Sequence, residues 1–193
     1  MKTINFILAF FIVLSVSAQD SKWDFDKSHS KVTFSVSHMM ISEIEGNFSK
    51  YSGTVLSDKS DFSDASVDFT IDVSSINTED AGRDKHLISA DFFNVEKYPS
   101  IIFKSKTMKK NGKDKYIMTG DLTMLGVTKT VTLDVKYGGT VKDPWGNTKA
   151  GFKISGVINR TLWGLRYNSV MDSGNMMVGE NVTIECNVEL KKQ

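Results

Sequence analysis

The chain has little of what several classes of protein require. A single cysteine, Cys186, stands among 193 residues, so no internal disulfide can form and stability has to come from packing and from hydrogen bonds between strands. Basic and acidic side chains nearly cancel, 24 against 23, which leaves no excess positive charge for nucleic acid or for an anionic membrane surface. The sequence also lacks a nucleophile elbow, and its serines and aspartates are too scattered to indicate a catalytic triad.

Long apolar runs are missing as well. The longest begins at Phe6 and ends at Leu14, well short of the ~20 residues that a membrane-spanning helix needs. Lys2 precedes this run and small residues up to Ala18 follow it, a pattern typical of an export signal. We therefore expect residues 1–18 to be a signal peptide cleaved near Ala18, and residues 19–193 to form one exported domain. The alternative, an uncleaved anchor, is disfavoured by the length of the run.

Alternating hydrophobicity is what the sequence has in quantity. In residues 65–73, apolar side chains such as Phe69 and Ile71 occupy one phase, and Asp68 and Asp72 occupy the other. Side chains of a strand alternate between its two faces, so this segment is predicted to be a half-buried strand with a solvated acidic face. The same alternation recurs over residues 23–26, 32–36, 44–56, 101–108, 116–124, 131–137, 150–158 and 182–190.

Turn signals separate these segments, and one helix interrupts them. Asn111-Gly112, Leu125-Gly126, Gly138-Gly139 and residues 143–147 are each expected to end a strand. Residues 78–90 carry apolar side chains at helical spacing and are predicted to form one short helix, capped by Thr78 or Asn77. Eight or nine strands with short connections indicate an all-β antiparallel barrel or sandwich, and glycines inside strands favour the barrel.

Several motifs, in order, make the chain resemble the YceI family. They are Trp23-x-Phe25-Asp26-x-x-His29-Ser30 with its continuation to His38, Asp84-Lys85-His86-Leu87 with its continuation to Phe93, Tyr98-Pro99-x-Ile101-x-Phe103, and Gly120-Asp121-Leu122-Thr123 with its continuation to Lys129. The resemblance implies a single lipocalin-like antiparallel β-barrel of about eight strands with one short helix. It further implies a periplasmic protein that holds a polyisoprenoid or an isoprenoid quinone in its bore and that can form a homodimer.

The resemblance and the alternation together predict the wall of the bore. Its expected apolar contacts are Phe34, Val36, Phe48, Phe69, Ile71, Phe92, Phe93, Ile101, Phe103, Leu122, Met124, Phe152 and Ile154. Alternation by itself does not separate an open bore from one filled by these same side chains. A filled barrel would indicate a stress or interaction protein with an apolar surface patch, expected around Trp145 and Trp163.

Three polar residues are candidates for contact with the headgroup of a lipid: His38, His86 and Arg160. The planar guanidinium of Arg160 suits a phosphate or carboxylate, although a salt bridge to a surface acid is an equal alternative. His38 and His86 could instead serve an enzyme acting on small lipid intermediates, but they lack a third metal ligand at diagnostic spacing. We expect no catalytic residue, no metal and no cofactor other than bound lipid. The chain departs from the family pattern at Thr161-Leu162-Trp163, where the family has Asp-Phe.

Overall fold

Antiparallel strands make up most of the computed structural model, which describes residues 21–172, 174 and 176–193. The predicted export signal lies outside these residues. The strands are β1 (Lys22–Phe25), β2 (Lys31–His38), β3 (Ser42–Phe48), β4 (Tyr51–Leu56), β5 (Ser66–Asp72), β6 (Ile76–Asn77), β7 (Ser100–Lys110), β8 (Lys115–Met124), β9 (Val127–Lys142), β10 (Thr148–Asn159) and β11 (Val178–Lys192). One α-helix, α1 (Ala81–Ile88), and two 3₁₀ turns, η1 (Val73–Ser75) and η2 (Arg160–Trp163), complete the described part.

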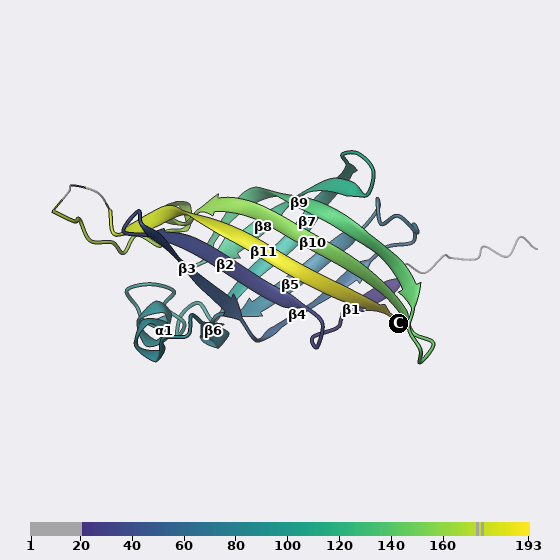
Figure 1. The fold of residues 1–193 in the computed structure, drawn as a ribbon, viewed down its shortest axis with the longest axis horizontal. Coiled ribbons are helices and arrows are strands. Elements are labelled where there is room, and N and C mark those ends of the chain that lie inside the picture. Colours follow the sequence, from purple (N-terminus) through teal and green to yellow (C-terminus); the bar gives the residue numbers. More distant parts are fainter. Residues whose placement is uncertain (1–20, 173, 175) are drawn as a thin grey trace, which may run out of the picture.

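The sheet closes on itself as a barrel (Figure 1). Its wall has eight positions, here called staves, each filled by one strand or by two consecutive strands. Five staves are the single strands β7 to β11. Each of the other three is built from two consecutive strands, β1 with β2, β3 with β4, and β5 with β6, because β4 pairs with β1 and β5 whereas β3 pairs with β2 and β6. Closure comes from β1 lying antiparallel to β11, with Trp23 opposite Lys192. The predicted barrel is confirmed, and the sandwich alternative is wrong.

Two local predictions differ from the structure. Gly138-Gly139 does not end a strand, because β9 continues to Lys142 and absorbs the irregularity as a register shift between Gly151 and Phe152 of β10. The cap of α1 is Asp80, whose carboxylate accepts a hydrogen bond from the backbone amide of Arg83 at 2.9 Å. The hydroxyl oxygen of Thr78 instead accepts a hydrogen bond from Nε of Arg83 at 2.7 Å.

Gly46 is one of the glycines inside strands, and it lies in β3. It pairs in register with Phe34 across β2 and β3, without a shift. A Cβ atom at this position would lie 2.4 Å from the ring of Phe34, which real contacts essentially never allow. The glycine therefore makes room for an inward-facing aromatic ring on the neighbouring strand.

One end of the barrel is closed by a loop that folds back into it. The β4–β5 loop carries Phe62, which is 1% exposed and contacts the rings of Trp23, Tyr137 and Phe152 at centroid distances of 4.9 to 5.5 Å. The hydroxyl of Tyr116 donates a hydrogen bond to the carbonyl of Asp61 at 2.5 Å and so fixes the loop. Phe62 therefore acts as an apolar plug between the ends of the strands.

An ion-pair cluster fastens the seam of the barrel near the same end. Lys149 of β10 donates to the carboxylate of Asp26 and, at 2.8 Å, to Glu189 of β11. The Lys149 side chain is only 11% exposed, so the contact is poorly screened by solvent. The hydrogen bond from this ammonium lowers the pKa of Asp26 to about 2, against an opposing effect of burial.

Acid is expected to weaken this cluster. Because the pKa of Asp26 is lower in the folded than in the unfolded chain, its contribution to stability is present above about pH 4 and is lost as the pH falls through about 2. Asp26→Asn should lower the free energy of unfolding at neutral pH by roughly 1–3 kcal/mol and should flatten the dependence of Tm on pH between about 4 and 2. Thermal unfolding across that range tests this, with the exposed Asp68→Asn as control. An unchanged pH profile in Asp26→Asn would contradict it.

Candidate functional site

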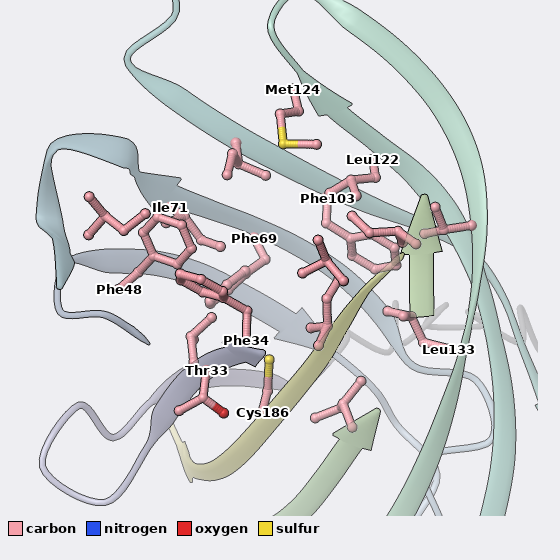
Figure 2. A pocket seen from close by; sticks show the side chains of 18 of the residues that line it. Thr33, Phe34, Phe48, Phe69, Ile71, Phe103, Leu122, Met124, Leu133 and Cys186 are labelled. Carbon is pink, nitrogen blue, oxygen red and sulfur yellow. The ribbon is translucent and has the colours of Figure 1, made fainter. Parts of the chain in front are cut away.

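An internal cavity of about 400 Å³ runs between the staves of the barrel, and its wall is almost entirely hydrocarbon. Its volume lies within the range of small-molecule pockets, ~300–1,000 Å³. All eight staves contribute side chains to the wall, because every second residue of each strand points inward. Figure 2 shows Phe34, Phe48 and Phe69 on one side of the space, and Phe103, Leu122 and Leu133 on the other.

Each residue predicted for the bore lies on the cavity wall. These are Phe34, Val36, Phe48, Phe69, Ile71, Phe92, Phe93, Ile101, Phe103, Leu122, Met124, Phe152 and Ile154, joined by His38, His86 and Arg160. Their contact with a ligand stays a prediction.

The wall also contains residues that the sequence interpretation left out. Leu133, Val135, Val182 and Ile184 carried the right alternation and could have been included. Phe62, Arg83 and Tyr167 come from loops and α1, where no alternating pattern indicated them.

The cavity has one polar end, at the mouth opposite the Phe62 plug. His86 of α1 lies edge-on to Tyr167, which follows η2, with ring centroids 4.6 Å apart, and both rings contact Phe92. This aromatic cluster joins the α1 segment to the β10–β11 connection across the mouth. His86 also lies 3.7 Å from the carboxylate of Asp91, a separation that gives a weak ion pair when the imidazole is protonated.

Arg83 and Thr78 form the base of α1 at the same mouth. The guanidinium of Arg83 donates to the hydroxyl and to the carbonyl of Thr78, both at 2.7 Å. Asp84 accepts from the Thr78 amide at 2.9 Å, so the start of the helix is tied to the end of β6. These hydrogen bonds hold Arg83 and Thr78 in place at the polar end of the cavity.

Arg160 is buried at the mouth and serves the backbone. Its Nε donates to Gly179 O at 2.8 Å, one Nη donates to Leu165 O at 2.6 Å and to Tyr167 O at 3.1 Å, and the other donates to Val178 O at 3.2 Å. Four of its five N–H groups are thus used to hold the β10–β11 connection. Burial lowers the pKa of this guanidinium from its usual range. Arg160 therefore binds backbone carbonyls instead of a surface acid, and most of its N–H groups are not available to a lipid headgroup.

Arg160→Gln is expected to release this connection. The shorter side chain cannot reach the same carbonyls, so we expect a loss of roughly 2–4 kcal/mol in the free energy of unfolding. Cleavage within residues 165–179 should also become faster. Thermal unfolding and limited proteolysis measure the two effects, and Arg166→Gln, which changes an exposed arginine of the same connection, is the control. A stable, protease-resistant Arg160→Gln protein would show that these hydrogen bonds contribute little.

The tryptophan at the departure from the family pattern is structural. Trp163 is 2% exposed, and its indole N–H donates to Leu122 O at 3.0 Å. Trp145 is 85% exposed in the β9–β10 turn, at the other end of the staves. The expected apolar patch shared by Trp145 and Trp163 is therefore wrong, because one ring is buried and the strands separate the two.

Two further groups of reactive side chains are occupied or inert. Asp26, His29 and Glu189 lie close enough for a metal ion, but the ammonium of Lys149 already bridges the two carboxylates. Burial raises the pKa of the Cys186 thiol to about 12, so at neutral pH it is a small apolar group on the cavity wall. No helix in the described residues is long and apolar enough to cross a membrane.

A closed antiparallel barrel of eight staves with an apolar internal cavity, plugged at one end and polar at the other, is the class of protein that these features define. The sequence model of the YceI-like domain matches residues 23–190, and the chain belongs to this family. A UPF0312 protein of Staphylococcus aureus is 35% identical over 170 residues, which cover 88% of this chain and 96% of that protein.

Solved structures share the barrel. Burkholderia cenocepacia BcnA superposes with a TM-score of 0.75 at 27% identity, covering 86% of this chain and 99% of that one. A polyisoprenoid binding domain from Saccharophagus degradans, implicated in plant cell wall breakdown, superposes with a TM-score of 0.67 over 89% of this chain and 98% of that one. Its identity is 13%, so this second likeness concerns the fold.

Proposed function

We propose that the protein binds a long apolar lipid, a polyisoprenoid or an isoprenoid quinone, in the barrel cavity and carries it in the periplasm without a chemical step. The observation that carries the proposal is the change in polarity of the cavity wall from one end to the other. Hydrocarbon lines the wall from the Phe62 plug upward, and polar side chains such as His38 and His86 gather at the mouth. A lipid with one polar end matches that gradient when its tail enters first.

The energetics favour such a ligand. Removing hydrocarbon from water is worth ~0.8 kcal/mol per methylene-sized group, so a tail of even a dozen carbons supplies enough transfer energy for tight binding without polar anchors. A small polar substrate would instead leave its hydrogen-bonding groups unpaired against this wall, at a cost of roughly 1–3 kcal/mol for each group. Methionines such as Met118 and Met124 on the wall can adapt to a flexible tail.

Membership of the YceI-like family and the precedent of a polyisoprenoid binding domain with the same barrel support the proposal. Export rests on the N-terminal pattern of residues 1–18. The volume of the cavity argues against the alternative of a barrel filled by its own side chains. An enzyme using His38 or His86 has no specific observation in its favour.

Extraction of the purified protein with organic solvent, followed by mass spectrometry, tests the proposal. We expect an isoprenoid lipid at a stoichiometry approaching one per chain, and uptake of added polyprenol by delipidated protein. Absence of bound lipid together with failure to take up polyprenol would overturn the proposal. His86→Ala should leave uptake intact, since the ring lies at the mouth and outside the hydrocarbon part of the wall.

A further inference from the structure

Exposed apolar side chains gather on two loops at the mouth of the cavity. The β2–β3 hairpin presents Met40, 68% exposed, and Ile41, 84% exposed, next to the half-exposed Met39. The β10–β11 connection presents Val170, 67% exposed, and Met176, 51% exposed. We call these five residues the apolar rim. Single exposed apolar residues are ordinary on protein surfaces, but a group of them around one opening is not.

The two loops form one continuous feature. Met39 N donates a hydrogen bond to Met177 O at 2.7 Å, and His38 pairs with Val178 where β2 meets β11. Val170 and Met176 are joined by a bridge within their own loop. Figure 1 shows both loops projecting beyond the staves at the end of the barrel where α1 lies. The apolar rim therefore flanks the mouth and lies far from the Phe62 plug.

The backbone of the β2–β3 hairpin is strained at two residues of the apolar rim. Met39 and Met40 have φ values of 53° and 62°, in the left-handed region that favours glycine or asparagine. A hairpin whose only task was to reverse the chain would be relaxed by Asn-Gly at these positions. Strained backbone of this kind clusters at functional sites, so it adds to the case that the hairpin has a task besides reversing the chain.

We propose that the apolar rim docks the mouth of the barrel onto a lipid bilayer by inserting Met40 and Ile41, with Val170 and Met176, among the acyl chains. This inference rests on the lipid-binding function proposed above, which explains why the mouth has to meet a membrane. A hydrocarbon tail leaving a bilayer through water would lose the transfer energy that holds it. An apolar rim in contact with the bilayer gives the tail a continuous path into the cavity.

The charges near the rim indicate how the docking works. Glu43 follows the hairpin, and Arg166 and Asp172 lie on the other loop, all three exposed. One cation against two anions gives no attraction to anionic headgroups. The docking is therefore driven by apolar insertion, and we expect little dependence on salt or on the fraction of anionic lipid.

Flotation with vesicles of phosphatidylcholine, with and without phosphatidylglycerol, tests the proposal without any cargo. We expect the protein to float with both kinds of vesicle, and the double variant Met40→Asp with Ile41→Asp to reduce the bound fraction about tenfold or more. Aspartate tolerates the left-handed backbone at position 40, so Tm should not fall. The matched control is Val141→Asp with Trp145→Asp, which places the same charges on exposed apolar residues at the plugged end and should leave binding unchanged.

Several results would overturn the docking proposal. The first is that the unaltered protein does not float with vesicles, and the second is that both double variants lose the same fraction of vesicle binding. The third is that the rim joins two copies of the chain, seen in sedimentation as a dimer that the Met40→Asp, Ile41→Asp variant dissociates. Uptake of the polyprenol solanesol from detergent micelles separates this proposal from the previous one. Rim variants should load from micelles like the unaltered protein while losing transfer from vesicles. If the unaltered protein floats yet never loads solanesol, the lipid-binding function fails and the docking stands.

Discussion

Replacing Cys186 by tryptophan is expected to abolish the uptake of a long polyprenol while leaving the barrel folded. Cys186 lies opposite Ile154 on β10 and Val32 on β2, and all three side chains line the cavity. It packs against both apolar clusters of the interior, the larger one and the smaller one around Phe62, so it lies where the two clusters meet. Figure 2 shows its sulfur pointing into the open space.

The size of the effect follows from the hydrocarbon that an indole would displace. Excluding two or three methylene groups costs ~2 kcal/mol, which corresponds to more than about tenfold in affinity, and blocking the passage excludes everything beyond it. The new ring enters a cavity of about 400 Å³, so the strain of overpacking should be small. Titration with a fluorescent polyprenol measures the affinity. Cys186→Val, small and apolar, is the matched control, and equal binding by Cys186→Trp would contradict the proposed ligand position.

Phe62→Ala is expected to produce the largest loss of stability. The phenylalanine is 1% exposed and is surrounded by three aromatic rings, so its truncation removes buried hydrocarbon and leaves a void. Such substitutions cost about 3–5 kcal/mol, which for a chain of this size lowers Tm by roughly 10 °C or more. The φ of Phe62 is 58°, and alanine bears the same backbone strain there, so the difference reports the side chain.

The matched control for this variant is Trp145→Ala. Trp145 is also a large aromatic residue near the plugged end, but it is 85% exposed, so its loss should change the free energy of unfolding by less than ~0.5 kcal/mol. Chemical denaturation of both variants tests the prediction. Similar midpoints for the two would show that the β4–β5 loop does not close the barrel. The open lower end of Phe62→Ala should also admit small apolar dyes more readily.

The strands and the cavity wall were predictable because a strand has an exact period of two. Once Phe69 and Ile71 are assigned to the inner face of β5, pairing carries that assignment to Phe103 and Ile101 of β7 in the same register. The same rule explains why Phe34 of β2 and Phe48 of β3, assigned independently, lie together on the inner face of these paired strands with their ring centroids 5.6 Å apart. Local alternation contains this information without any knowledge of the neighbouring strand.

Features that depend on contacts between a loop or turn and distant parts of the chain were not predictable from local alternation. The polar residues around Phe62 make its loop resemble an ordinary surface connection, and only the empty end of the barrel gives the ring a place. Arg160 resembles a headgroup anchor by its chemistry, yet its partners are carbonyls of residues up to 19 positions away, such as Gly179. Gly138-Gly139 has the composition of a turn, but a long β10 beside it keeps the strand extended.

The pairing of β1 with β11 has a consequence for how the protein is made. One neighbour of the first strand is β4, where Trp23 pairs with Val55, but its other neighbour is the last strand, at Lys192. The ring therefore stays open until the final segment has been synthesised. Contacts between such distant segments make folding slow, because loop-closure entropy is paid before the ring gains its last pairing. A nascent chain with an unfinished ring presents a bare β10 edge, and this is the species on which we expect a chaperone to act.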